Sequence, residues 1–319
     1  MMESIFFSIL IPAYKARFLS ETIQSCLNQS YSKFEIVIVD DASPEDIQGT
    51  VDTYKDSRIR FYRNKENCGA VNVVDNWNKC LEYAHGDYVI CMGDDDLLTS
   101  HCLEDYVDII TKYPGLNVYH TRTLLIDDNS KIWNIQEERP VYESGYSLWW
   151  FRWNGRDKQY LGDFLFLRQH LIDNGGFYKL PLAWASDDIT AVRAAIPKGI
   201  GNVSRAGFMY RKSPITISMT ASEQVKAEAS LKEKKWYLGL LSESIANNEE
   251  DALLITLLKS KISDHFREKV RQSFLLDVYS CPSHFWYWYK NCSTYSIPKM
   301  KVLQFFCKSL VGKFLNKCH

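Results

Sequence analysis

The sequence lacks the features that mark several broad classes of protein. Its nine cysteines are odd in number and include no Cys-x-x-Cys pair, which argues against a disulfide framework and a structural zinc site. No uncharged apolar run approaches the roughly 20 residues that a membrane-spanning helix needs. The 38 basic and 39 acidic residues leave a net charge of -1, so the total charge predicts no nucleic-acid partner. We therefore expect a globular, cytoplasmic protein with reduced thiols.

Two more absences concern the N-terminal part of the chain. The predicted first strand, Ile5–Pro12, is followed neither by a Gly-x-Gly-x-x-Gly motif nor by a glycine-rich phosphate loop. A dinucleotide oxidoreductase would carry the first, and a nucleotidyltransferase typically carries the second. Glu3 takes the place of a basic leader and Pro12 interrupts the apolar segment, so we expect a strand here and not a signal peptide.

The order of the elements predicts an α/β fold. Strands are expected at 5–12, 34–39, 59–63 and 88–92, and helices at 19–28, 71–83 and 102–113. This alternation implies right-handed crossovers and a mostly parallel sheet flanked by helices. The strand ends at Pro12, Asp40 and Met92 should then meet at one edge, where open α/β sheets bind ligands.

An acidic stretch follows the fourth predicted strand. Tyr88–Met92 leads into Gly93 and the three carboxylates Asp94–Asp96. Because successive side chains on an extended segment alternate in direction, at most two of the carboxylates can face one point. Two are enough to hold Mg²⁺ or Mn²⁺ beside the phosphates of a nucleotide. The alternative is a solvated acidic turn before the next helix, but a similarly placed upstream pair, Asp40–Asp41, favours a binding site.

From Asn117 onward the pattern of the sequence changes. A hairpin is expected at 117–126 and 131–135, a strand at 207–212, and two long helices at 223–245 and 250–275. Between them lies an aromatic segment that contains Trp149, Trp150 and Trp153. These rings are either part of the core or a wall on which a sugar could stack.

Three motifs, taken together, resemble those of the inverting family 2 glycosyltransferases of GT-A fold. They are the stretches Ser8–Tyr14, Glu35–Ser43 and Gly86–Asp96. The resemblance implies transfer of a sugar from a nucleotide diphosphate donor, expected to be a UDP-sugar, to a glycan or a lipid-linked saccharide. It also implies a role in the synthesis of cell-surface polysaccharide.

The same resemblance implies a domain organisation. A GT-A catalytic domain would span 1–218, with a Rossmann-like nucleotide-sugar-binding half at 1–116 and an acceptor half at 117–218. The remaining segment, 219–319, would form a helical C-terminal region with a basic aromatic tail.

Carried over residue by residue, the family motifs imply a nucleotide site at the sheet edge. Ala13 and Tyr14, after Pro12, would line the nucleobase pocket. Asp41 would bond the base or the ribose, and Asn76 would pack beside the nucleotide.

The acidic stretch departs from the family pattern at its first position. Gly93 stands where the family commonly has aspartate, so Asp94 would take the ribose-side role. A divalent metal, Mn²⁺ or Mg²⁺, would be bound by Asp95 and Asp96, with Asp95 the better ligand. Ser213 stands where the family often has histidine, which removes a third protein ligand.

The implied reaction needs a positive charge and a base, for which three more residues are candidates. Displacement of a nucleoside diphosphate requires neutralisation of its charge, for which Arg211 is the candidate. A base must also accept the proton of the acceptor hydroxyl. In the family this is an acidic residue that opens a helix after a Gly-Phe segment, which here implies Asp187 or Asp188, with the spacing to Arg193 favouring Asp187. For Asp40 a binding role and a strand-end turn stay open, and both helix-opening aspartates could simply stabilise a helix N-terminus.

The tail and the overall activity leave alternatives. After Asp277 the chain has no acidic residue, and Leu303, Phe306, Leu310 and Phe314 recur at helical spacing among lysines. Such a basic amphipathic helix either contacts the anionic inner face of a membrane or packs on the protein. A non-catalytic glycan-binding or scaffold protein of GT-A fold and a nucleotidyltransferase remain the alternative functions.

Overall fold

The computed structural model describes residues 4–156, 158–212 and 222–315 and divides into two compact units. The first consists of Met1–Lys179 and Ser186–Thr216, and the second of Leu180–Ala185 and Ile217–His319. Ser213 lies outside the described residues, and so does the expected domain boundary at 218, which stays a prediction.

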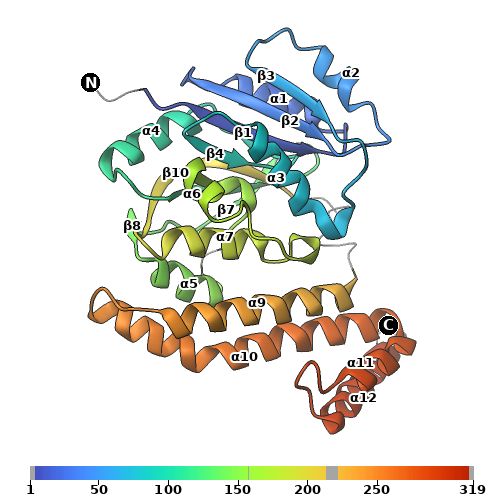
Figure 1. The fold of residues 1–319 in the computed structure, drawn as a ribbon. Helices are drawn as coiled ribbons and strands as arrows, with labels where there is room; N and C mark the ends of the chain where they lie inside the picture. The colour runs from blue at the N-terminus through green and yellow to red at the C-terminus, as the bar shows by residue number, and fades with distance from the viewer. Residues whose placement is uncertain (1–3, 157, 213–221, 316–319) are drawn as a thin grey trace. The chain divides into compact units, whose positions relative to one another are not determined.

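The first unit is built on one mixed sheet (Figure 1). Within the described residues the strands follow the order β3-β2-β1-β4-β9-β6-β10-β5, with β7 beside β6 and β8 beside β10. Their bounds are β1 (Phe7–Ala13), β2 (Phe34–Asp40), β3 (Ile59–Arg63), β4 (Tyr88–Cys91), β5 (Leu97–Leu98), β6 (Val118–Ile126), β7 (Ile132–Ile135), β8 (Tyr142–Glu143), β9 (Phe164–Leu167) and β10 (Ile200–Arg211). The helices are α1 (Leu19–Leu27), α2 (Ile47–Asp52), α3 (Val73–Tyr83), α4 (Cys102–Lys112), α5 (Gly145–Trp153), α6 (Arg168–Asp173) and α7 (Ser186–Ala195), with single 3-10 turns η1 (Ala70–Asn72) and η2 (Leu161–Asp163).

The two halves of the sheet differ in strand direction. Strands β3, β2, β1 and β4 are all parallel, as the alternation of strands and helices predicts. Strand β9 then runs antiparallel to both β4 and β6, while β6 and β10 are parallel to each other. The predicted β6–β7 hairpin is present. The expected α/β fold is confirmed, with a final strand that begins seven residues earlier than the predicted 207–212.

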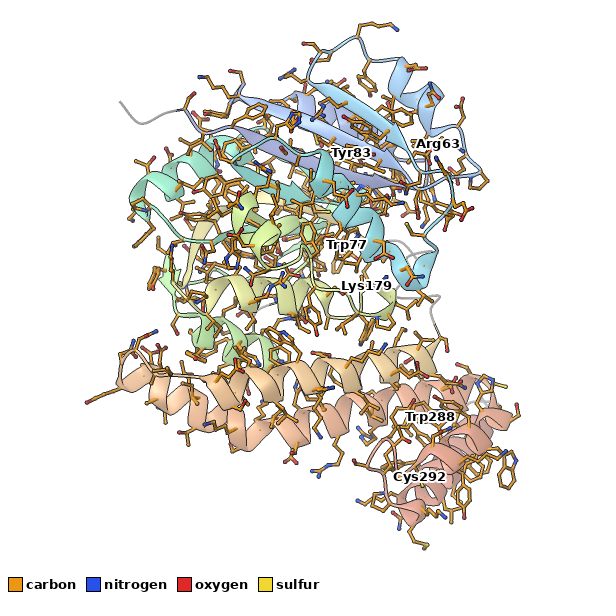
Figure 2. The ribbon with its side chains drawn as sticks, viewed as in Figure 1. Arg63, Trp77, Tyr83, Lys179, Trp288 and Cys292 are labelled. Carbon is orange, nitrogen blue, oxygen red and sulfur yellow. The ribbon has the colours of Figure 1, made fainter. Side chains whose placement is uncertain are left out.

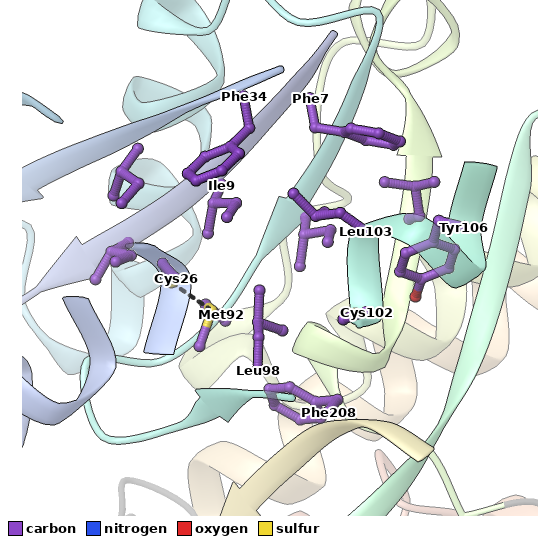
Figure 3. Packing of buried hydrophobic residues seen from close by; sticks show 14 of the residues in the cluster. Phe7, Ile9, Cys26, Phe34, Met92, Leu98, Cys102, Leu103, Tyr106 and Phe208 are labelled. Atoms are coloured by element: carbon purple, nitrogen blue, oxygen red, sulfur yellow. Dashed lines mark hydrogen bonds between the residues drawn. The ribbon is translucent and has the colours of Figure 1, made fainter. Parts of the chain in front are cut away.

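Helices cover both faces of the parallel half because alternate strand residues point to opposite sides. On one face Phe7, Ile9 and Phe34 pack with side chains of α1 and α4, and Figure 3 shows this cluster around Leu103 and Tyr106. On the other face α3 packs on β1 and β2. Removal of this apolar surface from water, at about 25 cal/mol per Å², is the main term that stabilises the sheet.

The aromatic segment that contains Trp149 and Trp153 forms α5. Trp149 and Trp153 are buried and pack edge to face, with ring centroids 5.1 Å apart. The core interpretation of these two tryptophans is therefore confirmed, and neither offers a face to a sugar.

The second unit is helical within the described residues. It contains η3 (Pro181–Ala183), α9 (Glu223–Glu243), α10 (Glu249–Ser280), η4 (Pro282–His284), α11 (Phe285–Asn291) and α12 (Lys299–Leu315). Its core includes Phe274 and Trp288, the latter labelled in Figure 2, and the Trp288 indole N–H donates to Asp277 Oδ2 at 2.8 Å. None of the described helices has the length and apolar character that crossing a membrane requires.

The apolar side of α12 agrees with the predicted stripe at Phe306 but not at Leu303. Val302 is fully buried, and the Phe306 ring lies 4.4 Å from that of Phe285, centroid to centroid. Leu303, which the stripe contains, is 40% exposed instead. The part of the tail around Val302 and Phe306 therefore packs on its own unit, because these two side chains point toward α10 and α11.

Candidate active site

Backbone hydrogen bonds join the loops that follow β1, β2 and β4. The register pairs Ala13 with Asp40, and the Asp41 N–H donates to the Ala13 carbonyl at 2.9 Å. The Met92 N–H donates to the Leu10 carbonyl at 3.0 Å. The three strand ends therefore meet at one edge, as the sequence predicts.

Asp94 connects two of these loops through its side chain. Its Oδ2 accepts hydrogen bonds from the backbone N–H of Tyr14 at 2.6 Å and of Lys15 at 2.7 Å. Burial, together with the negative charge of Asp95, raises the pKa of Asp94 to about 6. The carboxylate thus shapes the loop after Pro12, a contact that the ribose-side assignment does not include.

The loop that Asp94 holds presents an aromatic side chain. Tyr14 is 44% exposed, while its neighbour Ala13 is fully buried within β1. The Ser43 hydroxyl donates to the Tyr14 carbonyl at 2.5 Å, which fixes the backbone on the side of β2. An exposed aromatic ring on an ordered backbone is suited to stacking on a nucleobase.

Asp95 and Asp96 have different environments. Asp96 is buried, and its carboxylate accepts from the backbone N–H of Arg211 at 2.9 Å and of Gly93 at 3.3 Å. No other described residue donates a hydrogen bond to the half-buried carboxylate of Asp95. Burial raises the pKa of Asp95, and Lys15 opposes this shift.

These carboxylates fit a metal only with the help of a ligand. Among the described residues no group of three His, Cys, Asp or Glu side chains could hold an ion by itself. Mg²⁺ and Mn²⁺ commonly take one or two protein carboxylates and complete their shell with phosphate oxygens and water. Asp95 has the oxygens available for this arrangement, whereas Asp96 already uses both of its own to hold the turn.

Arg211 lies beneath the acidic turn and does not face solvent. Its side chain is fully buried, with Nε donating to the Asp95 carbonyl at 2.7 Å and Nη1 to the Asp127 carbonyl at 2.9 Å. Nη2 donates to Glu21 and to Ser130, and the guanidinium stacks on Phe18. The geometry gives Arg211 a positioning role and does not favour the predicted contact with a diphosphate.

The two aspartates at the end of β2, Asp40 and Asp41, make different contacts. Asp40 is fully buried and accepts from the Ser43 N–H at 2.8 Å and from Arg63, which Figure 2 labels at the end of β3. These bonds stabilise a turn in which Ala42 has a left-handed φ of 49°. For Asp40 the structure therefore favours the turn alternative.

Asp41 belongs to a network with the loop before α3. Its Oδ1 accepts from Asn64 Nδ2 at 2.7 Å and from the Cys68 N–H at 3.0 Å. Asn64 also donates to Asn76 Oδ1 at 3.0 Å, and Asn76 donates to the Val39 carbonyl. Asn64 thus links Asp41 to Asn76, whose place beside a nucleotide stays a prediction. Sequence reasoning missed Asn64, although its polar amide directly follows a strand.

Asp187 and Asp188, at the start of α7, also have different partners. Asp188 accepts a bidentate pair from Arg152, at 2.8 and 3.1 Å, and a hydrogen bond from Gln159 at 2.5 Å. Asp187 accepts from the Asp188 backbone N–H at 2.9 Å. Burial, and next the negative charge of Asp188, raises the pKa of Asp187 to about 7.

An aromatic pair lies near both acidic groups. The rings of Tyr160 and Tyr210 stack with centroids 4.1 Å apart and planes inclined by 19°. Burial and then the charges of Asp96, Asp95 and Asp187 raise the pKa of Tyr210. Sequence reasoning missed this pair, because only the fold brings residues 50 positions apart into contact.

The N-terminal part of the chain matches a protein-family model. The model described as Glycosyl transferase family 2 matches residues 8–177, more than half of the chain. The chain belongs to glycosyl transferase family 2. The matched residues include the acidic turn and the loops after β1 and β2, while α7 and β10 lie beyond them.

Curated relatives match over part of their own length. The chain is 32% identical over 125 residues to a putative glycosyltransferase, EpsE, of Bacillus subtilis, which covers 38% of this chain and 44% of that protein. It is 30% identical over 130 residues to the Escherichia coli UDP-Glc:alpha-D-GlcNAc-diphosphoundecaprenol beta-1,3-glucosyltransferase WfgD, which covers 40% of this chain and 50% of that protein. The chain thus spans about half the length of the curated relatives it matches.

Solved structures show the same fold. S. aureus TarS 1-349 in complex with UDP-GlcNAc has a TM-score of 0.64 at 15% identity, covering 85% of this chain and 81% of that one. The complex with UDP has a TM-score of 0.59 at 16% identity, covering 87% and 81%. The expected GT-A-type fold of this family is therefore confirmed.

Proposed function

We propose that this protein is an inverting glycosyltransferase that moves a sugar from a UDP-sugar to a saccharide acceptor in cell-surface polysaccharide synthesis. WfgD, by its name, uses UDP-Glc and a diphosphoundecaprenol-linked acceptor, and TarS has been crystallised with UDP-GlcNAc. These relatives support a UDP-sugar donor and a glycan or lipid-linked acceptor.

One observation carries the proposal. In this family 2 chain, contacts connect the acidic turn to the start of α7: the Arg211 N–H donates to Asp96, Tyr210 stacks on Tyr160, and Gln159 donates to Asp188. Burial and the charge of Asp188 raise the pKa of Asp187, beside it, to about 7, which suits proton transfer. A general base is most effective when its pKa lies near the working pH. Donor-side and acceptor-side acidic groups therefore share one region of the first unit.

The chain's own residues can supply most of the proposed chemistry. Tyr14 would stack on the base, and the Asp41 network would bond the nucleoside. Asp187 would accept the proton of the acceptor hydroxyl. The hydroxyl oxygen would form a bond to the anomeric carbon of the donor sugar as the bond from that carbon to the diphosphate breaks. A single displacement of this kind inverts the anomeric configuration.

A divalent cation, Mn²⁺ or Mg²⁺, fits the proposal as the group that neutralises charge on the departing diphosphate. Asp95 would bind it, with the donor's phosphate oxygens and water as the other ligands. Lys15, which interacts electrostatically with Asp94 and Asp95, adds positive charge on the same side.

The test compares three proteins in a panel of UDP-sugars with Mn²⁺, following UDP release with and without added saccharide acceptor. Asp187→Asn should reduce turnover by about 10² to 10⁴, the usual contribution of a positioned base, with UDP affinity nearly unchanged. If Asp188→Asn has this effect and Asp187→Asn does not, the base assignment is wrong. If the unmodified protein releases no UDP from any donor but binds saccharide, the scaffold alternative replaces the proposal.

A further inference from the structure

A charged clamp holds the residue next to the proposed base. Arg152 comes from α5 and Gln159 from the segment before η2, and both donate to the carboxylate of Asp188. The bidentate geometry, at 2.8 and 3.1 Å, is the most directional ion pair available to a guanidinium. Side chains from two other segments of the first unit therefore hold this carboxylate of α7.

The clamp continues to Asp187 through the backbone. The N–H of Asp188 donates to Asp187 Oδ1 at 2.9 Å, so the position of Asp188 fixes one oxygen of its neighbour. Asp188 is buried, and a buried carboxylate without partners would be strongly unfavourable. Arg152 and Gln159 supply the partners that this buried carboxylate needs.

We propose that Arg152, assisted by Gln159, is a positioning residue that orients Asp187 and balances the charge around it through Asp188. This inference rests on the proposed function, because it assumes that Asp187 is the base. Neither Arg152 nor Gln159 needs to contact the substrate in this role.

The charges around Asp187 predict the direction of each effect. Asp188 on the same helix and Asp163 of η2 raise the pKa of Asp187, and Arg152 of α5 lowers it. Tyr210 of β10 also interacts electrostatically with this group, and a tyrosine adds no charge near pH 7. Loss of the cation and loss of the neighbouring anion should therefore shift the proton affinity of Asp187 in opposite directions.

The experiment measures the pH dependence of kcat for Arg152→Met, Arg152→Lys and Asp188→Asn in the full chain with UDP-sugar and Mn²⁺. Arg152→Met should move the apparent pKa upward by about one unit or more, and Asp188→Asn should move it downward by a similar amount. Arg152→Lys keeps the charge and should restore most of the wild-type profile, although it loses the bidentate geometry.

Two controls are needed. One shows whether a variant is folded, and the other distinguishes failure of this inference from failure of the proposed function. UDP binding and the thermal midpoint of each variant show whether it is folded, and the profile of any folded variant decides the matter. The positioning role would be wrong if Arg152→Met and Asp188→Asn moved the apparent pKa equally in one direction, or if they lowered kcat without changing the pH profile. Asp187 would remain the base in either case. Full activity of Asp187→Asn would overturn the proposed base first.

Discussion

At the scale of single residues, neighbours in the sequence have different tasks because their side chains meet different partners. Asp95 and Asp187 keep oxygens for a ligand, whereas Asp96 and Asp188 are bonded by protein donors. The Asp96 carboxylate holds backbone N–H groups, and the Asp188 carboxylate holds the side chains of Arg152 and Gln159. Each pair therefore contains one carboxylate that is proposed to act on a ligand and one that supports the local structure.

The titration of Asp187 predicts how activity depends on pH. A base works only when ionised, so with a pKa of about 7 the rate should fall about tenfold per pH unit below pH 6 and reach a plateau above pH 8. The measurement is kcat from pH 5 to 9 at saturating donor. A profile that is flat across this range contradicts the assignment.

The same shift has a consequence for stability. A pKa raised above its unfolded value of 3.8 stabilises the fold at low pH, and this contribution is lost as pH rises through about 7. Asp187→Asn should therefore unfold at a higher temperature than the wild type at pH 8, although it is less active. Thermal unfolding at pH 6 and pH 8 measures the difference, which should be larger at pH 8.

Asp95 and Asp96 offer a matched pair for the metal. Asp95→Asn should abolish Mn²⁺-stimulated turnover and leave the free energy of unfolding within about 0.5 kcal/mol of the wild type, because no other described residue donates to its carboxylate. Asp96→Asn should cost about 1 to 3 kcal/mol, because the amide accepts through one oxygen only and leaves one of the two backbone N–H groups without a partner. Turnover that survives chelation of all divalent metal would contradict the role given to Asp95.

At the scale of elements, the position of α7 depends on a link to α3. The Asn78 side chain on α3 accepts from the Phe177 N–H at 2.8 Å and donates to its carbonyl at 3.3 Å. Arg193 on α7 donates to the carbonyl oxygens of Asn174 and Gly176. The Gly-Phe segment therefore joins the helix that carries the proposed base to the parallel half of the sheet.

Two adjacent glycines test this link. Gly175 and Gly176 both have a left-handed φ, of 76° and 87°, so alanine at either site costs about 1 kcal/mol of backbone strain. A Cβ on Gly176 would also clash with Asn78, whereas one on Gly175 meets nothing within 4 Å. Gly176→Ala should therefore lower both thermal stability and kcat more than Gly175→Ala does. Equal effects in the two variants would mean that the link is dispensable.

At the scale of the whole molecule, the family model matches residues 8–177 and does not reach the helical unit with its basic tail. Within that unit Val302 and Phe306 pack inward, so the tail has apolar partners of its own. Its lysines, with no acidic residue after Asp277, remain suited to an anionic surface. Membrane contact stays a prediction.

Liposome binding tests this prediction. The full chain should bind anionic vesicles at low salt, and Lys299→Glu/Lys301→Glu should weaken binding by about thirtyfold or more, since each of the two lysines near such a surface contributes on the order of 1 kcal/mol and the new glutamates are repelled. Lys232→Glu/Lys235→Glu, on α9, makes the same charge change elsewhere in the unit and serves as the control. Charge reversal is preferable to deletion of 298–319, which would also remove the packing of Val302. Absence of binding by the unmodified chain identifies the tail as a packing element only.

The sequence by itself determined the α/β order, the sheet edge where Pro12, Asp40 and Met92 meet, and the family. These depend on local information, because apolar periodicity and the ends of strands are properties of short segments. Only the tertiary structure decided which carboxylate at each site is bonded and which is not, because that depends on donors such as Arg152 and the Arg211 backbone, which are distant in sequence. It likewise buried the Arg211 charge and brought Tyr160 against Tyr210, since long-range packing leaves no signal in any single segment.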